Sequence, residues 1–166
     1  MTSSARRKTS AKGRAHSGSP LYTLAVLLTD GPISKKFGGK TISRTVQILG
    51  RQTLADLHGV IFDAFDRDES HLYEFNLGQG PSDRSRLFPP DGFSADDSTD
   101  SPRKTKLDSL DLRVGQLFGY TFDMGDNWQH AIEVRAIEPC AEQDHFPTII
   151  ERLGTSPPQY ADLEEE

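Results

Sequence analysis

The chain has 166 residues, of which 34% are hydrophobic, so it is long enough for one domain with a real core. No apolar run approaches the roughly 20 residues of a membrane helix, and no stretch near the N-terminus has the form of a signal peptide, so we expect a cytoplasmic protein. The single cysteine, Cys140, excludes an internal disulfide framework and a multi-cysteine zinc site.

The first 19 residues contain five basic side chains, no acidic ones and few apolar ones, which predicts a disordered basic tail over 1–19. Removing these five from the 19 Lys and Arg of the chain leaves 14 basic against 25 acidic residues, a formal charge of −11. Such a body repels a phosphate backbone. We therefore expect nucleic acid to bind weakly at most, through the basic tail.

Two strands are predicted after this tail. The apolar run Leu21–Leu28 ends in the turn residues TDGP, a pattern typical of a buried strand. From 40 to 49 polar and apolar residues alternate, which indicates a half-buried strand. Arg44 falls on the same side of that strand as Ile42 and Val46.

An amphipathic helix is predicted over 53–66, where apolar residues recur at three- and four-residue steps. Thr53 is a suitable N-cap, with Asp56 as its capping-box partner. His58 falls on the apolar face, where a packed core histidine is more common than a ligand. Gly59 inside the helix predicts that another backbone segment approaches closely there.

The segment after the helix combines a strand and a long loop. Residues 71–78 alternate and predict a strand, with Glu74 on the side opposite His71. Residues 79–104 are rich in Pro, Gly, Ser and Asp, so we predict a mobile loop with a short edge strand near 86–88.

The order of these elements predicts the fold class. Two strands, a helix and further antiparallel strands favour a single α+β domain over 20–154, mainly an antiparallel sheet with the helix packed on one face. That order is compatible with a β-grasp-like arrangement. A proline-rich acidic tail is expected over 155–166. The sequence has no internal repeat, phosphate loop or nucleophile elbow.

The stretch YTFDMGDNWQH places two carboxylates, an indole and an imidazole around one glycine. A hairpin with the three-residue loop Gly125–Asn127 would pair Met124 with Trp128 and Phe122 with His130. This register brings apolar residues opposite one another, whereas a slip by one residue would invert every side chain. We therefore predict that Trp128 and His130 lie on the apolar face.

The same register separates the carboxylates from the rings, because Asp123 points to the opposite face and Asp126 lies at the loop tip. A structural hairpin is therefore favoured over a ligand site or a metal site. No catalytic residue is assigned. Six residues with functional groups in or near this motif are candidates for binding a ligand or partner: His71, Glu74, Asp123, Asp126, Trp128 and His130.

Four stretches in order, TLADLHGVIFDAFD, HLYEF, YTFDMGDNWQH and FPTIIERLGTSPPQY, resemble the plasmid pRiA-type ORF-three-like domain family. Members of that family are also labelled insertion-element passenger proteins. The resemblance covers about 21–160 and implies a prokaryotic α+β domain often found near mobile elements, with no established reaction. In many relatives a cysteine and paired glycines follow the late PP. This chain continues QYADLEEE instead, so no role of that cysteine carries over.

Two functional hypotheses remain. The first is a noncatalytic module that binds a protein or peptide through the sheet face or an exposed edge beside the long loop, with no cofactor. The alternative is a metal-dependent hydrolase or nuclease, in which Asp126 and His130, with His71 or Glu74, hold a divalent metal and its bound water. We favour the first, because the acidic body lacks a coherent nucleophile or phosphate motif.

Overall fold

The computed structural model describes residues 18–90 and 101–160. Most of the predicted basic tail and the centre of the predicted mobile loop lie outside these ranges. The elements follow the chain as β1 (Leu21–Asp30), β2 (Ser43–Leu49), α1 (Leu54–Ala64), β3 (Tyr73–Asn76), β4 (Leu87–Phe88), the 3-10 helix η1 (Leu107–Leu110), β5 (Leu117–Phe122), β6 (Trp128–Glu138) and β7 (Thr148–Leu153).

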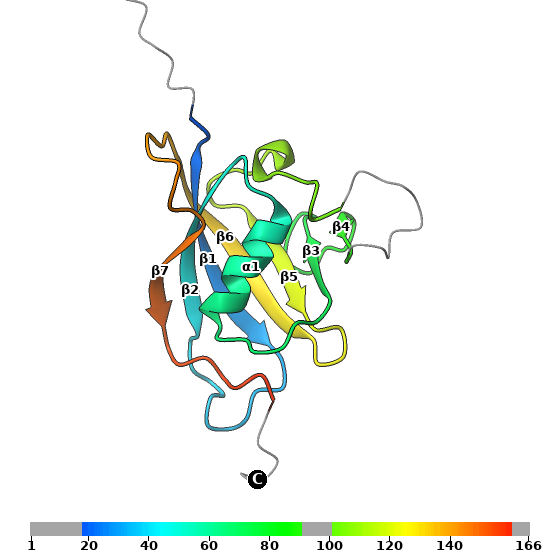
Figure 1. Ribbon diagram of the computed structural model, residues 1–166. Helices are drawn as coiled ribbons and strands as arrows, with labels where there is room; N and C mark the ends of the chain where they lie inside the picture. The colour runs from blue at the N-terminus through cyan, green and yellow to red at the C-terminus, as the bar shows by residue number, and fades with distance from the viewer. Residues whose placement is uncertain (1–17, 91–100, 161–166) are drawn as a thin grey trace, which may run out of the picture.

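The strands form one seven-stranded sheet in the order β4-β3-β5-β6-β1-β2-β7, and every neighbouring pair is antiparallel. Helix α1 lies across one face of this sheet (Figure 1). The structure confirms a single domain built mainly of antiparallel sheet with one helix, while the β-grasp-like arrangement stays a prediction. No helix in the described ranges is long and apolar enough to cross a membrane.

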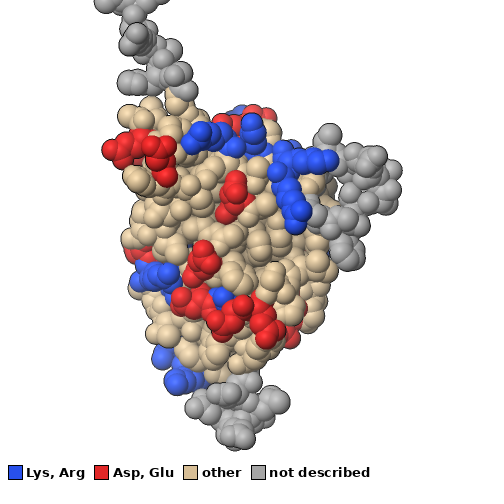
Figure 2. Space-filling model, viewed as in Figure 1, with Lys and Arg blue, Asp and Glu red and all other residues tan. Residues whose placement is uncertain are grey.

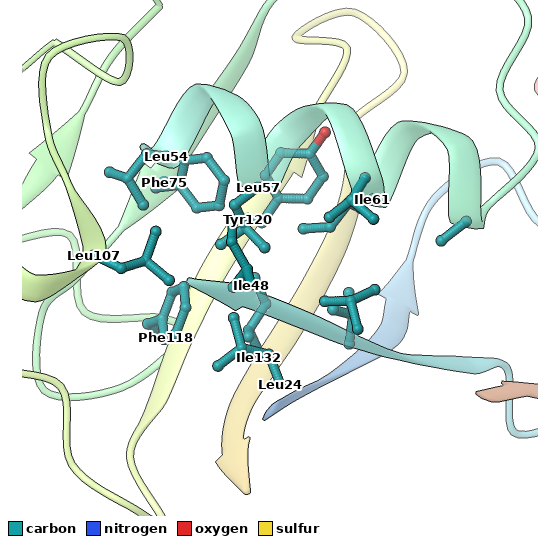
Figure 3. Close-up of a cluster of buried hydrophobic side chains, with 14 of the residues drawn as sticks. Leu24, Ile48, Leu54, Leu57, Ile61, Phe75, Leu107, Phe118, Tyr120 and Ile132 are labelled. Carbon is teal, nitrogen blue, oxygen red and sulfur yellow. The ribbon is translucent and has the colours of Figure 1, made fainter. Parts of the chain in front are cut away.

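The core lies between α1 and the sheet, where the alternation of the strands turns one row of side chains toward the helix. Leu24 and Ile48 come from the two neighbouring strands β1 and β2, and Leu57 and Ile61 come from the helix above them (Figure 3). Each is at most 1% exposed, and burying such a side chain stabilises the fold by about 1.5–3 kcal/mol. Tyr120 lies in the same layer, with its hydroxyl turned toward the helix.

The N-terminus of α1 is fixed in two ways. Thr53 Oγ1 accepts a hydrogen bond from the Asp56 amide at 3.2 Å and Asp56 Oδ2 accepts one from the Thr53 amide at 2.9 Å, which confirms the predicted capping box. The carbonyls of Thr105 and Pro102 accept hydrogen bonds from the next two amides of the helix, at 2.9 and 3.0 Å. The last residues of the predicted loop therefore pack against the helix.

The structure agrees with the prediction made for Arg44 and disagrees with the one made for Gly59. Arg44 lies on the apolar side of β2 as predicted and is only 2% exposed. Gly59 is exposed, and a Cβ built on it would meet nothing within 4 Å. The predicted close approach of another backbone at Gly59 is therefore wrong, because the glycine lies on the solvent side of the helix.

Charge is divided along the face that carries α1. Acidic side chains gather near the C-terminal end of the helix, and basic ones gather near its N-terminal end (Figure 2). Exposed Asp66, Asp68 and Glu69 follow the helix, whereas exposed Arg103 and Lys104 adjoin its first turn. This arrangement opposes the helix dipole, so it does not serve the stability of α1.

Candidate functional site

The hairpin of β5 and β6 has a different register from the predicted one. Phe122 pairs with Trp128 and Tyr120 pairs with His130, so the connection contains five residues, 123–127, instead of three. The prediction of an odd-numbered loop was right and its length was wrong. Because the shift is by two residues, Trp128 and His130 still lie on the face that was predicted for them.

The loop is longer because Asp123 organises the turn instead of extending the strand. Its Oδ1 accepts hydrogen bonds from the amides of Gly125 at 3.0 Å and Asp126 at 3.3 Å. Its carbonyl accepts a third hydrogen bond from the Asn127 amide at 2.7 Å. Asp123 and Asn127 both have positive φ angles, 63° and 53°. These two residues, and not Gly125, supply the left-handed conformation that closes the loop.

Trp128 and His130 lie inside the molecule, at 0% and 3% exposure. His130 Nδ1 lies 3.3 Å from the carbonyl oxygen of Tyr120, and its ring contacts Phe65 edge to face with centroids 4.9 Å apart. Burial, and after it the nearby positive charge of Arg67, lowers the pKa of His130 to about 3. His130 is therefore a neutral interior side chain at pH 7.

Arg67 is a buried residue that the sequence did not single out. Its guanidinium carbon lies 3.9 Å from the centre of the Trp128 ring, in a cation–π contact. Burial lowers its pKa to about 10, which still leaves the side chain charged near neutral pH. Arg67 follows the helix in a polar stretch with no periodicity, so no pattern in the sequence indicates that it turns inward.

A pocket of about 340 Å³ opens beside the first half of α1 and the start of β3. Five of its residues belong to two stretches that carried the family resemblance, the predicted helix and the predicted strand after it. The pocket is lined by Ala55, His58, Ser70, His71, Leu72, Tyr73, Pro90 and Arg103. The fold therefore brings the helix and strand motifs together at one concave surface.

His58 forms the inner wall of this pocket. Its ring stacks on Tyr73 with centroids 3.6 Å apart and an angle of 5° between the planes. Its Nδ1 lies 2.7 Å from the hydroxyl of Tyr120, which comes from the opposite side of the core. The prediction that His58 packs within the apolar face describes its position, although one edge of the ring faces the pocket.

Burial fixes the protonation of this pair. It raises the pKa of the Tyr120 hydroxyl well above 10 and lowers the pKa of His58 to about 4, so both are neutral at pH 7. A neutral imidazole carries one ring hydrogen: with that hydrogen on Nε2 the Tyr120 hydroxyl donates to Nδ1, and with it on Nδ1 the hydroxyl accepts. In both tautomers Nδ1 is engaged inside the core and Nε2 is left for a hydrogen bond to a ligand.

His71 forms the outer wall of the pocket and belongs to a chain of polar contacts. Its Nε2 lies 3.6 Å from Asp123 Oδ2 and 2.8 Å from the hydroxyl of Tyr160. That hydroxyl donates to Glu69 Oε2 at 2.8 Å, and this hydrogen bond raises the pKa of Tyr160 to about 12. The contact between His71 and Asp123 was not predicted, because the register had placed Asp123 away from the other candidates.

The other candidate residues lie apart from this cluster. Glu74 lies on the opposite face of the sheet and forms an ion pair with Arg84 at 2.9 Å. Asp126 is exposed at the hairpin tip. Within residues 18–90 and 101–160, no three His, Cys, Asp or Glu side chains are placed to hold a metal ion. The predicted set of Asp126, His130 and His71 is therefore not assembled, since His130 lies in the core.

Comparison with known proteins gives relatives without an assigned activity. A protein of Sinorhizobium fredii called "Uncharacterized protein y4hQ" is 31% identical over 107 residues, which are 64% of this chain and 52% of that protein. The chain thus spans about half the length of this curated relative. The crystal structure of MM3350, a protein of unknown function from Methanosarcina mazei Go1, covers 86% of this chain and 74% of its own, with a TM-score of 0.64 and 24% identity. That likeness shows the fold alone.

The family model of the plasmid pRiA4b ORF-3-like protein matches residues 33–162. This range contains the helix, the hairpin and the late PP segment on which the resemblance was based. The chain therefore belongs to the plasmid pRiA4b ORF-3-like protein family.

Proposed function

We propose that this domain is a noncatalytic protein- or peptide-binding module, and that the pocket beside α1 and β3 anchors the partner. One observation carries the proposal: His58, His71 and Tyr73, from separate motifs, line one pocket of about 340 Å³. A pocket of that size accepts one or two side chains of a peptide. Pro90 also lines the pocket, and it lies two residues after β4. Since β4 is the edge strand of the sheet, a sheet edge adjoins the pocket.

The chemistry of the lining indicates what part of a partner would bind. The stacked rings of His58 and Tyr73 offer a flat apolar wall, and His58 offers a donor in the tautomer that carries its hydrogen on Nε2. Arg103 also lines the pocket, at the basic end of the α1 face. A peptide group with a hydrogen-bond acceptor beside an apolar or aromatic body meets these requirements.

The state of His58 supports binding over catalysis. A general base works best with a pKa close to the working pH, and burial holds the pKa of His58 at about 4. Its Nδ1 is already engaged with the Tyr120 hydroxyl, at 2.7 Å. His58 is therefore suited to hold a hydrogen bond and unsuited to accept a proton from a substrate at pH 7.

The test uses two leucines with nearly equal exposure. Leu72 lines the pocket and is 43% exposed, whereas Leu117, at the start of β5, does not line it and is 44% exposed. Peptides would be selected from a random 12-residue phage library on the full chain and their affinities measured by fluorescence polarisation. Leu72→Asp should weaken binding at least tenfold and Leu117→Asp should leave it unchanged. Equal effects of the two variants, or no selectable peptide, would argue against the pocket.

The alternative, a metal-dependent hydrolase or nuclease, draws on one specific contact. His71 Nε2 and Asp123 Oδ2 lie 3.6 Å apart and could supply two ligands to a divalent metal. Elemental analysis of chain purified without chelator tests it, with His71→Ala as the variant and the exposed His145→Ala as the control. Stoichiometric metal that only His71→Ala loses would favour a hydrolase. Association with mobile elements and a cytoplasmic location stay predictions.

A further inference from the structure

Four buried side-chain nitrogens have no hydrogen-bond partner among the described residues. They are Nη1 and Nη2 of Arg67, Nε1 of Trp128 and Nε2 of His130. The three side chains are 7%, 0% and 3% exposed. A buried polar group without a partner typically costs about 1–3 kcal/mol, and more when it is charged, so three neighbouring side chains of this kind call for a common explanation.

The three side chains form one cluster on the face of the sheet that α1 covers. Trp128 and His130 are two residues apart in β6, so they point the same way. The Arg67 guanidinium lies 3.9 Å from the Trp128 ring centre, and both Arg67 and His130 contact the ring of Phe65. This group of Arg67, Trp128 and His130 is called the Arg67 cluster below.

Aromatic contacts do not complete the hydrogen bonding of Arg67. The rings of Trp128, Phe65 and Phe122 lie 3.9 to 6.0 Å from its guanidinium carbon, and they offer π faces to the positive charge. A guanidinium also carries N–H donors in a planar fork, and these require acceptors. No ion pair of Arg67 with a carboxylate is present within 18–90 and 101–160.

We propose that the Arg67 cluster is a binding site for a carboxylate. Both terminal nitrogens of Arg67 lack protein partners, and this is the pair that binds the two oxygens of a carboxylate side by side. The Trp128 Nε1 hydrogen is a third donor for the same group. His130 Nδ1 faces a carbonyl oxygen and therefore carries the ring hydrogen, so Nε2 of the neutral ring is an acceptor and the three donors come from Arg67 and Trp128.

Residues 156–160, here called the C-terminal cover, are bonded to the backbone on both sides of Arg67. Ser156 Oγ donates to the Phe65 carbonyl at 2.8 Å, and Gln159 Oε1 accepts from the amides of Asp68 and Glu69 at 2.8 and 3.0 Å. In the proposed site, this cover lifts from residues 65–69 to admit the carboxylate.

Two sources could supply the carboxylate. One is a small free acid. The other is this chain, because residues 161–166, outside the described ranges, follow the C-terminal cover directly and read ADLEEE. Both sources offer the same chemical group, so the site is tested first with a simple probe and the source is then identified with a charge-neutralised variant.

The probe is acetate, with acetamide as its neutral counterpart of the same shape. Trp128 is the only tryptophan of the chain, so its fluorescence reports directly on the Arg67 cluster. Acetate should change the emission of the full chain in a saturable way and raise its melting temperature, whereas acetamide at equal concentration should do neither. Equal responses to acetate and acetamide would overturn the proposal.

The variants separate a site from a general salt effect. Arg67→Met should weaken the acetate response at least tenfold and Arg67→Lys should weaken it less, because lysine keeps the charge and loses the fork. The control is Arg44→Met, which removes a buried arginine whose Nε and Nη1 already donate to backbone carbonyls and which should keep the acetate response. A saturable response that persists unchanged in Arg67→Met would mark adventitious binding and overturn the site.

The source is identified by a full-length chain with Asp162→Asn, Glu164→Gln, Glu165→Gln and Glu166→Gln. If the acidic segment occupies the Arg67 cluster, this variant should bind acetate more tightly than wild type, because the internal competitor has lost its charge. If the natural ligand is a free acid, the two affinities should agree. An acetate response in neither chain would overturn the site for both sources.

Discussion

Arg44 and Arg67 are both buried, and their guanidinium groups lie 5.2 and 6.0 Å from the same Phe65 ring. Arg44 donates to four carbonyl oxygens, those of Ala64, Ser43, Leu153 and Gly154, at 2.7 to 3.0 Å. The terminal nitrogens of Arg67 donate to none in the described chain. One region thus satisfies its buried cation with its own backbone, while the other leaves donors unused next to a tryptophan and a histidine.

The difference teaches how a buried charge can be interpreted. A cation whose Nε and Nη1 donate to backbone carbonyls connects parts of the fold, and Arg44 joins the end of α1 to the end of β7. A cation with unused donors is an unfavourable way to build a core, so its retention points to a ligand. The following four predictions test this distinction, from the largest expected effect to the smallest.

Acid should act on the Arg67 region through its histidine. The pKa of His130 is about 3 and that of His58 about 4, against about 6.5 in an unfolded chain, so the unfolded chain binds protons that the folded one does not. The free energy of unfolding should therefore fall as pH drops below about 6.5, by about 4 kcal/mol at pH 5 for the two together. Urea unfolding at pH 7, 6 and 5 measures it. A flat profile would show that neither ring is buried as described.

Arg44→Met should be strongly destabilising, by about 3 kcal/mol. The substitution removes a side chain that is 2% exposed and leaves the carbonyls of Leu153 and Gly154 without the donor they share, while Ala64 keeps the hydrogen bond from Arg152 at 2.7 Å. Chemical denaturation at pH 7 gives the value. A loss below about 1 kcal/mol would remove the contrast between the two arginines.

Arg67→Met should change stability by no more than about 1 kcal/mol, in either direction. Methionine fills the space against Trp128 without a buried charge, and replacing a buried charge by an apolar side chain is often neutral or stabilising. The same variant should raise the pKa of His130, since it removes the neighbouring positive charge. Urea unfolding and NMR titration of the imidazole give both values. A loss comparable to that of Arg44→Met would mean that Arg67 is a structural residue.

Gly59→Ala should stabilise wild type, Arg44→Met and Arg67→Met equally, by about 0.5–1 kcal/mol. The position is exposed and a Cβ meets nothing there, so only the helix propensity of α1 changes. Comparing the three pairs by urea unfolding checks additivity. Unequal gains in the free energy of unfolding would show that the two arginine regions are coupled through the helix. The difference between Arg44 and Arg67 would then not arise from their immediate contacts alone.

The sequence predicted the elements better than the contacts between them. The strand at 40–49 carried Arg44 on its apolar side, and this polar residue in an apolar row was a real signal of a buried arginine. The Thr53 capping box could also be predicted from the sequence, because both partners lie within one turn. Local patterns of this kind do not depend on the rest of the fold.

The contacts that define the pocket, and the register of the hairpin, could not be predicted from the sequence in the same way. His58 meets the Tyr120 hydroxyl across 62 residues, and no spacing rule connects them. The hairpin register failed because Asp123 takes a positive φ and bonds the turn amides, where apolar matching alone favoured a shorter loop. Arg67 was missed because it stands outside any periodic segment.

The position of β1 in the sheet also affects how the chain is made. β1 hydrogen-bonds to β2 on one edge and to β6 on the other, and in the described part of the chain β6 is followed by the single strand β7. During translation, β1 can form a hairpin with β2 early, but its second edge, with Leu24 and Val26, stays unpaired until Trp128–Glu138 has left the ribosome. Such a long-lived apolar edge makes nascent chains prone to aggregation, so this domain should depend on chaperones more than a protein with local pairings does.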